Sequence, residues 1–191
     1  MNLPELPWIA TAKSLLGVRE IGSTNKGAEI EKWATALCGG KPPSYIYPQP
    51  WCGTFVAHCL QKNGFTKGNV NCRKVGYDKK GAGANKYPFN WYGAGDYAKE
   101  AGAKLLKPCY GCVAIKSRAG GNHVCFVVGR DKATNKLVCI GGNQSNMVSY
   151  ALYTESEFND FMWYGKTANP SQGRYDLPIL TDITATKVSE S

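Results

Sequence analysis

The stretch "HVCFVVGRDKATNKLVCIGGNQ", residues 123–144, contains two short apolar runs separated by a polar segment. Runs rich in Val, Ile and Phe on either side of a Lys-, Asp- and Asn-containing turn predict a β-hairpin. If the turn is centred between the runs, Val127 lies opposite Cys139 and His123 lies opposite Asn143. Directly opposed residues of antiparallel strands have Cβ atoms about 5 Å apart. We therefore expect the Asn143 amide within hydrogen-bond reach of the His123 ring.

The segments flanking this hairpin predict the fold class. Further strand-type runs occur at residues 112–117, 147–153 and 161–166. Before them, apolar residues at helical spacing end at glycines, which predicts helices over 7–17, 23–40 and 52–64, with a fourth, short helix over 91–103. Helices followed by an antiparallel meander indicate an α+β domain. We expect N-terminal helices packed on a small antiparallel sheet of about five strands.

The 191 residues, 43% hydrophobic and 19% charged, fit a single globular domain. We assign residues 1–167 to it, with an irregular basic insertion at 65–90 and a C-terminal tail at 168–191. No apolar run approaches the roughly 20 residues of a bilayer span, so no stable membrane insertion is expected. No signal peptide is visible, which predicts synthesis in the cytoplasm. The eight cysteines are then expected to be mostly reduced and buried.

The net charge of +9 is concentrated in one part of the chain. Residues 62–118 hold twelve Lys and Arg against three Asp and Glu, and the remainder is balanced. This segment is either a solvated loop or a surface that meets a polyanion such as cell wall, anionic lipid or nucleic acid. The candidate substrate-attracting residues are Lys74, Lys79, Lys80 and Lys86.

A candidate nucleophile lies in "QPWCGTFVAHCL", residues 49–60, where Cys52 begins a predicted helix. A helix N-terminus favours the thiolate and is expected to lower the pKa of this thiol. Of the two histidines, His58 lies on another face of the same helix and cannot reach Cys52. His123 opens a strand beside Asn143. We therefore predict a Cys52–His123–Asn143 triad, in which Asn143 orients the ring.

These segments resemble the CHAP-like, NlpC-type cysteine amidases and endopeptidases of phage and bacterial cell-wall lysis. "PWCGTFVAHCL" resembles their nucleophile segment, "GGNHVCFVVG" their histidine strand, "CIGGNQSNMVSY" the next strand, and "PWIATAKSLLGVREI" the opening helix. Together they span residues 7–64 and 108–167. The departures are Gly53 and Thr54 for the usual small pair, Asn122 before the histidine, Cys125 for a glycine, and a longer basic connection.

The resemblance implies a papain-like fold and hydrolysis of an amide bond in or beside the peptidoglycan stem peptide. The enzyme is then an N-acetylmuramoyl-L-alanine amidase or an endopeptidase, with Cys52, His123 and Asn143 in the family roles. The backbone N–H of Cys52 is expected in the oxyanion hole. Oxyanion and substrate contacts are assigned to Gln49, Trp51 and Tyr47, with Tyr45 as a further candidate.

This chemistry needs no metal or cofactor. The expected partner is a wall fragment, and the protein is expected to be a monomer that does not bind nucleic acid. It would act on the cell wall or in the periplasm after release or delivery, as an endolysin, a tail-borne lysin or a secreted effector. An effector would also have an immunity protein as partner.

Two alternatives belong to other classes. "CYGC" at 109–112 has metal-ligand spacing, and Cys125 and Cys139 complete a four-thiolate set for a zinc-stabilised nucleic-acid-binding module. The basic, aromatic-containing stretch "KKGAGANKYPFNWY" would then bind phosphates and stack bases. The other alternative is an inactive wall-binding protein that keeps the fold.

Overall fold

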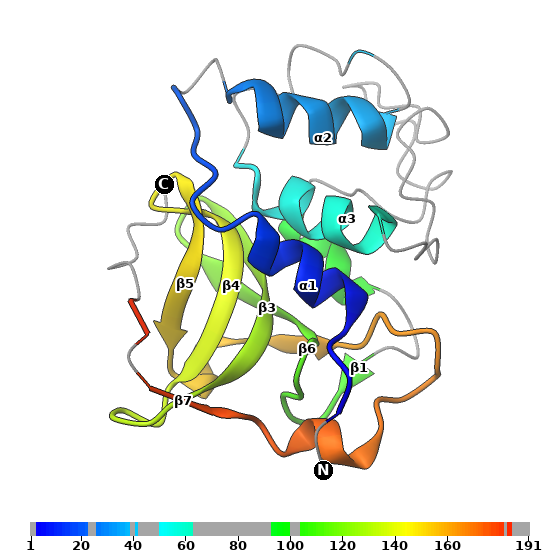
Figure 1. The fold of residues 1–191 in the computed structure, drawn as a ribbon, viewed down its shortest axis with the longest axis vertical. Helices are drawn as coiled ribbons and strands as arrows, with labels where there is room; N and C mark the ends of the chain where they lie inside the picture. The colour runs from blue at the N-terminus through cyan, green and yellow to red at the C-terminus, as the bar shows by residue number, and fades with distance from the viewer. Residues whose placement is uncertain are drawn as a thin grey trace.

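The computed structural model describes residues 3–22, 26–38, 41, 50–62, 93–99, 104–181 and 183–184. Within these ranges the chain is α+β, with helices first and a curved, mainly antiparallel sheet after them (Figure 1). Several predicted features lie outside the described residues: the insertion at 65–90, the candidates Gln49, Tyr47 and Tyr45, and the lysines Lys74, Lys79, Lys80 and Lys86. No helix in the described ranges has both the length and the apolar character needed to cross a bilayer.

Three α-helices confirm the helical predictions: α1 (Pro7–Ser14), α2 (Ala28–Cys38) and α3 (Cys52–Lys62). Proline in the first turn of α1 lacks only an N–H that would have no helical partner there. Helix α3 lies between α2 on one side and the sheet on the other, and α1 packs beside it (Figure 1). This central position explains why nearly every side chain of its first three turns is buried.

The predicted fourth helix is a short 3₁₀-helix, η2 (Ala94–Lys99), within the part of the chain described there. Its Tyr97 is fully buried, and the Tyr97 hydroxyl donates a hydrogen bond of 2.7 Å to the Gly53 carbonyl. The Tyr164 hydroxyl donates in turn to the Tyr97 carbonyl at 2.9 Å. These bonds hold η2 against the first turn of α3.

The sheet has more strands than the five expected. The strands are β1 (Lys104–Leu105), β2 (Val113–Arg118), β3 (Gly121–Asp131), β4 (Leu137–Gln144), β5 (Met147–Tyr153), β6 (Asp160–Met162) and β7 (Ile179–Leu180). Their order is β1-β6-β2-β3-β4-β5, all antiparallel, and β7 pairs with β3 in parallel. The short β1 and β7 lack the alternating apolar pattern, so sequence reasoning missed them.

Part of the expected C-terminal tail packs on the domain. After the short η3 (Glu155–Glu157) and β6, the chain forms η4 (Gln172–Tyr175) and then β7. The Arg130 N–H donates to the Pro178 carbonyl at 2.8 Å, and the Lys132 N–H donates to the Leu180 carbonyl at 2.9 Å. The tail therefore adds backbone hydrogen bonds to β3, through at least Leu180.

The sheet curls strongly, so its two faces have different surroundings. His123 on β3 and Tyr153 on β5 are separated by β4, yet their ring centroids are only 6.2 Å apart. Tyr153 also meets Phe158, which follows η3, at 5.2 Å between centroids. Such contacts require the sheet to bend towards this face, which we call the inner face. The outer face is covered by α1, α3 and η2.

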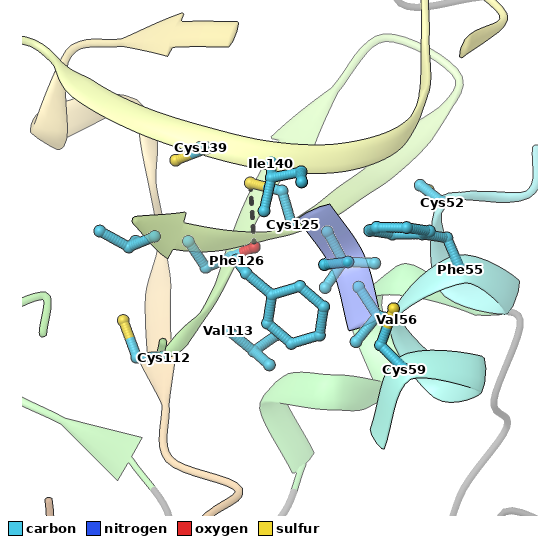
Figure 2. Packing of buried hydrophobic residues seen from close by; sticks show 14 of the residues in the cluster. Cys52, Phe55, Val56, Cys59, Cys112, Val113, Cys125, Phe126, Cys139 and Ile140 are labelled. Carbon is cyan, nitrogen blue, oxygen red and sulfur yellow. Dashed lines mark hydrogen bonds between the residues drawn. The ribbon is translucent and has the colours of Figure 1, made fainter. Parts of the chain in front are cut away.

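Figure 2 shows that β3 presents buried side chains to both faces of the sheet. Phe126 lies on the helix side of the strand, and its ring packs edge-on against Phe55 of α3 at 6.2 Å between centroids. Cys125 and Cys139 lie on the opposite side of β3 (Figure 2). The prediction that these two cysteines are buried is confirmed. The expectation that they face the Cys52 helix is wrong, because the strand presents its even-numbered residues there.

Candidate active site around Cys52

Cys52 is the first residue of α3, where the sequence predicts it. The first hydrogen bond of the helix runs from the Phe55 N–H to the Trp51 carbonyl at 3.0 Å. The thiol is 1% exposed and lies beside the backbone of Val124 on β3. Helix α3 thus delivers the sulfur to the strand that carries His123.

Trp51, immediately before Cys52, is held by a buried ion pair. Its indole N–H donates to Glu20 Oε2 at 2.8 Å, and Lys26 Nζ lies 2.5 Å from Glu20 Oε1. Both charged side chains are less than one-tenth exposed. On the other side, a Cβ added to Gly142 of β4 would come within 2.7 Å of the Trp51 ring. Trp51 is therefore fixed as a structural anchor, and its 2% exposure gives a substrate no surface to bind.

A cavity of about 480 Å³ opens beside Cys52. Its walls come from η2, from the β2–β3 hairpin and from the start of β6. Asp96, Lys99, Arg118 and Asp160 supply its charged groups. Of the six cysteines with described side chains, Cys52 is the one that lines this cavity. Among these six cysteines, Cys52 is therefore the one placed to react with a small solute in the cavity.

The electrostatics of Cys52 differ from the sequence expectation. Burial raises the pKa of the thiol above its ordinary value, which outweighs three kinds of group that favour the thiolate. These groups are the Val124 backbone, the positive charge of Arg118 and the backbone at the start of α3. The backbone at the start of α3 therefore lowers the pKa of the thiol, as predicted. Desolvation of the enclosed thiol raises the pKa by more than the helix start lowers it.

His123 lies on the inner face of the sheet, away from the Cys52 cavity. Successive side chains of a strand point to opposite faces, and Phe126 faces α3. His123 is directly opposite Lys116, whose ammonium lies 4.6 Å from the Tyr153 ring centroid on the inner face. Asn122, the residue before His123 in β3, lines the cavity, whereas His123 is not among the described residues that line it. The structure does not bring the side chains of Cys52 and His123 together.

The hairpin register agrees with the sequence prediction where the ladder is regular. Val127 is opposite Cys139, as expected, and Phe126 is opposite Ile140. Towards its end β4 is irregular: its pairing with β5 shifts between Gly141 and Gln144, and Asn143 adopts a φ of +57°. Asn and Asp tolerate this left-handed conformation better than most residues.

The amide that meets His123 in this arrangement is that of Gln144. His123 Nε2 lies 3.4 Å from Gln144 Oε1, which also accepts a hydrogen bond of 3.2 Å from the Tyr153 hydroxyl. The Gln144 NH₂ group donates to the Ser149 carbonyl at 2.6 Å. Asn143, the predicted orienting residue, is buried with 3% exposure. The irregular backbone at Asn143 turns the Gln144 side chain towards His123. No feature of the sequence predicted this irregularity.

His58 lies away from Cys52, as the sequence predicts, and it has a structural role between two helices. Its ring stacks on Trp33 of α2, with centroids 5.1 Å apart. Its pKa is lowered to about 4, mainly by burial and also by the nearby charge of Lys62, while Glu29 acts in the opposite direction. A ring in this position packs two helices together and lies away from the Cys52 cavity.

The four cysteines of the zinc alternative do not form a ligand set. Cys109 and Cys112 share a tight turn, in which the Cys109 N–H lies 3.4 Å from Cys112 Sγ. Cys112 lies apart from Cys125 and Cys139 (Figure 2). Within the described ranges, no group of three or more His, Cys, Asp or Glu side chains is arranged to hold a metal ion. The six cysteines with described side chains are buried and form no disulfide with one another.

No protein-family model, curated protein or solved structure matches this chain. Its function must therefore be inferred from its own residues and their geometry.

Proposed function

We propose that this protein is a CHAP-like cysteine hydrolase, of papain-like fold, that cleaves an amide bond in or beside the stem peptide of peptidoglycan. The observation that carries the proposal is the placement of Cys52. It is the first residue of a helix, it lines a cavity of about 480 Å³, and it lies against the strand that carries His123. A thiol at a helix start beside a cavity is a candidate nucleophile for covalent catalysis, and it requires an adjacent base to become active.

The proposed reaction has two steps. The Cys52 sulfur attacks the amide carbonyl carbon while His123 accepts the thiol proton, and the C–N bond then breaks as His123 returns that proton to the leaving amine. Water, deprotonated by His123, next attacks the thioester and releases the acid and the free thiol. Backbone N–H groups at the start of α3 point out of the helix and stabilise the oxyanion in both steps.

This mechanism requires the His123 side chain to reach the face of β3 that packs against Cys52 of α3. The β2–β3 hairpin turns through Gly120 and Gly121, whose φ values of +83° and +144° are accessible to glycine. Because side chains alternate along a strand, a shift of one residue at this end of β3 exchanges the faces of Asn122 and His123. The active form in this proposal has the His123 ring in the Cys52 cavity.

A second candidate is an inactive wall-binding protein of the same fold. The observation that favours it is the inner-face position of His123, whose Nε2 lies near Gln144 Oε1. If His123 keeps this position when substrate binds, neither of the two histidines can serve Cys52 as a base, because His58 also lies away from the cavity. The two candidates predict opposite outcomes in a single assay.

The test is digestion of purified cell walls, followed by turbidity and by mass spectrometry of the released fragments. The wild-type protein is expected to release fragments with new amine and carboxylate ends. Cys52→Ala and His123→Ala should each lower the rate by at least about a thousandfold, because the nucleophile and its base act as a unit. His58→Ala is the matched control, and it should keep a rate close to that of the wild type.

Other outcomes separate the candidates. Binding to walls without any new chain ends would favour the inactive protein. Full activity of Cys52→Ala would contradict the proposal altogether. Loss of activity in His58→Ala with normal activity in His123→Ala would mean that the base is assigned to the wrong histidine.

A further inference from the structure

A second cavity, of about 340 Å³, shares no lining residue with the Cys52 cavity. Its walls come from the N-terminal segment, the end of α1, β3, β5, η4 and β7. Many of its lining side chains are aliphatic: Leu3, Val128, Pro178, Leu180 and Ile183. Binding cavities for small molecules are mostly apolar, with a few polar groups, and begin at roughly 300 Å³. This cavity therefore has the size and the walls to hold a small aliphatic molecule.

Arg174 of η4 lines this cavity and is buried, with 8% exposure. Its Nη2 donates a hydrogen bond of 3.2 Å to the Pro4 carbonyl. Its Nη1 is also enclosed, but it has no hydrogen-bond partner among the described residues. A buried, charged donor without an acceptor is costly. An acceptor brought to Nη1 would therefore stabilise the protein.

Two carboxylates line the same cavity, and neither supplies this acceptor. Glu5 accepts a hydrogen bond of 2.8 Å from Lys13 with one oxygen and one from the Tyr110 hydroxyl with the other. The charge of Arg174 also acts on Glu5, but Lys13 is the cation in direct contact with that carboxylate. Asp176 is exposed, so solvent screens its charge. Among the described charged groups of this cavity, Arg174 is thus the buried one that lacks a carboxylate in contact.

We propose that this cavity binds a small aliphatic carboxylate, whose carboxylate group contacts Arg174 and whose aliphatic part packs against Val128 and Leu180. A carboxylate oxygen would give Nη1 a charge-assisted hydrogen bond, which is stronger than a bond between neutral groups. It would also bring a negative charge to a guanidinium group that is shielded from solvent. The inference does not depend on the proposed hydrolase function, because Cys52 does not line this cavity.

In the proposed complex the Leu3 side chain moves aside to admit the ligand to Nη1. Leu3 packs beside Arg174 on η4, since a Cβ added to Gly173 would lie 3.3 Å from Leu3 Cδ1. Leu3 also lines the cavity and is partly exposed. Its displacement would uncover the guanidinium group without disturbing β3 or β7.

The first experiment titrates the wild-type protein with two carboxylates, hexanoate and N-acetyl-L-leucine, and with the neutral carboxamide of each. Hexanoate represents a free fatty acid, and N-acetyl-L-leucine represents the end of a peptide chain. Isothermal titration calorimetry measures the Kd values. The carboxylate of the natural ligand class should bind at least about tenfold more tightly than its carboxamide, as a charge-assisted hydrogen bond predicts. The carboxylate with the lower Kd identifies the source. Equal Kd values within both pairs would overturn the inference, and so would the failure of all four compounds to bind at millimolar concentrations.

Variants then locate the site. Arg174→Gln should remove the preference for the carboxylate, while Arg174→Lys, which keeps the charge, should retain part of it. Lys32→Gln is the control, because it removes an exposed charge of α2 that pairs with Glu29, and it should leave all Kd values unchanged. An unchanged preference in Arg174→Gln would overturn the inference.

A measurement on the wild type covers the case in which Arg174→Gln does not fold. Nuclear Overhauser effects from the aliphatic protons of the bound carboxylate should reach the methyl groups of Val128 and Leu180. Effects that reach Ile115, which lines the Cys52 cavity, would instead overturn the inference. Cys52→Ala should bind the carboxylates with the wild-type Kd even if it loses wall hydrolysis. Loss of this binding in Cys52→Ala would place the ligand in the Cys52 cavity and contradict the proposal.

Discussion

Glu20 and Lys26 form an ion pair that is almost wholly removed from solvent, and the pair holds the residue next to Cys52. Removing one member of a buried pair strands the other charge without compensation, which is far more damaging than losing an exposed pair. The position of the sulfur therefore depends on two residues more than twenty positions away in the sequence.

Glu20→Gln should accordingly destabilise the protein by about 3–5 kcal/mol, because it leaves the Lys26 ammonium buried without its partner. Urea unfolding measures this free energy. The control is Glu5→Gln, which breaks an exposed pair with Lys13 and should cost about 1 kcal/mol or less. Equal effects of the two substitutions would show that the Glu20–Lys26 pair contributes no more than a surface pair.

His58 gives a prediction about acid stability. Its pKa is about 4 in the folded protein and 6.5 when unperturbed. Between these values the unfolded state binds a proton that the folded state does not, so acidification favours unfolding. The contribution is present at neutral pH and is lost as the pH falls through this window.

Urea unfolding at several values between about pH 7 and about pH 4 tests this prediction. The free energy of unfolding of the wild type should fall more steeply with acidification than that of His58→Gln, which cannot bind the proton. Parallel curves for the two proteins would contradict the assigned role of burial at His58.

At the level of single elements, the alternation of side chains along β3 determines which of them face α3 and which lie on the inner face of the sheet. The even-numbered residues Val124 and Phe126 face α3, and the odd-numbered residues His123 and Cys125 lie on the inner face of the sheet. The bulge between Val127 and Gly129 changes the pairing by one residue with respect to β4. A register shift of one residue would move the His123 side chain from one face of β3 to the other. The proposed mechanism therefore depends on the Gly120–Gly121 turn, at which such a shift would begin.

Gly129 at that bulge also sets how closely β7 approaches. A Cβ there would lie 2.6 Å from the Pro178 carbonyl oxygen and 2.8 Å from the Leu180 side chain. Gly129→Ala should therefore push β7 away from β3 and cost roughly 1–3 kcal/mol, the usual penalty of overpacking. The Arg130 and Lys132 amides, which donate to the Pro178 and Leu180 carbonyls, should then exchange their hydrogens faster.

Gly22→Ala is the control for this measurement, since a Cβ at Gly22 meets nothing within 4 Å. It should leave the exchange of both amides unchanged. Normal protection of Arg130 and Lys132 in Gly129→Ala would mean that β7 does not depend on the close approach at Gly129.

For the molecule as a whole, the charge distribution gives the clearest prediction. Residues 62–118 carry the entire net charge of +9, and they join α3 to the sheet. A patch of one sign raises the local concentration of an anionic polymer, and salt screens this attraction over about 8–10 Å. Replacing Lys74, Lys79, Lys80 and Lys86 with Gln should weaken binding to intact walls at low salt and flatten the salt dependence of that binding.

Turnover of a short soluble muropeptide should hardly change in this quadruple variant, because a small substrate needs no long-range attraction. Sedimentation with purified walls across a salt series measures the binding, and fragment release measures the turnover. Unchanged wall binding at low salt would contradict the prediction, as would a collapse of the small-substrate rate.

Local patterns in the sequence were sufficient to predict most of the helices and strands. Helical spacing of apolar residues predicted α1, α2 and α3, and alternation predicted β2 to β6, because burial on one or two faces imposes these periods directly on the chain. The pairing of Val127 with Cys139 also followed from the sequence, since a short turn between two regular strands leaves little freedom of register. The start of α3 at Cys52 was also predictable, because the apolar residues that follow Cys52 recur at helical spacing.

Only the tertiary structure decided what surrounds those residues. Burial of Cys52 against β3 reverses its expected pKa shift, and the bond from Trp51 to Glu20 joins segments that no local pattern connects. The left-handed Asn143 brings Gln144 to His123, and the alternation of β3, counted from Phe126, turns that histidine away from the thiol. The sequence determines which residue types are present and the periods of their burial. Which face of a curled strand each residue occupies depends on contacts between elements far apart in the chain, and those contacts are a property of the folded molecule.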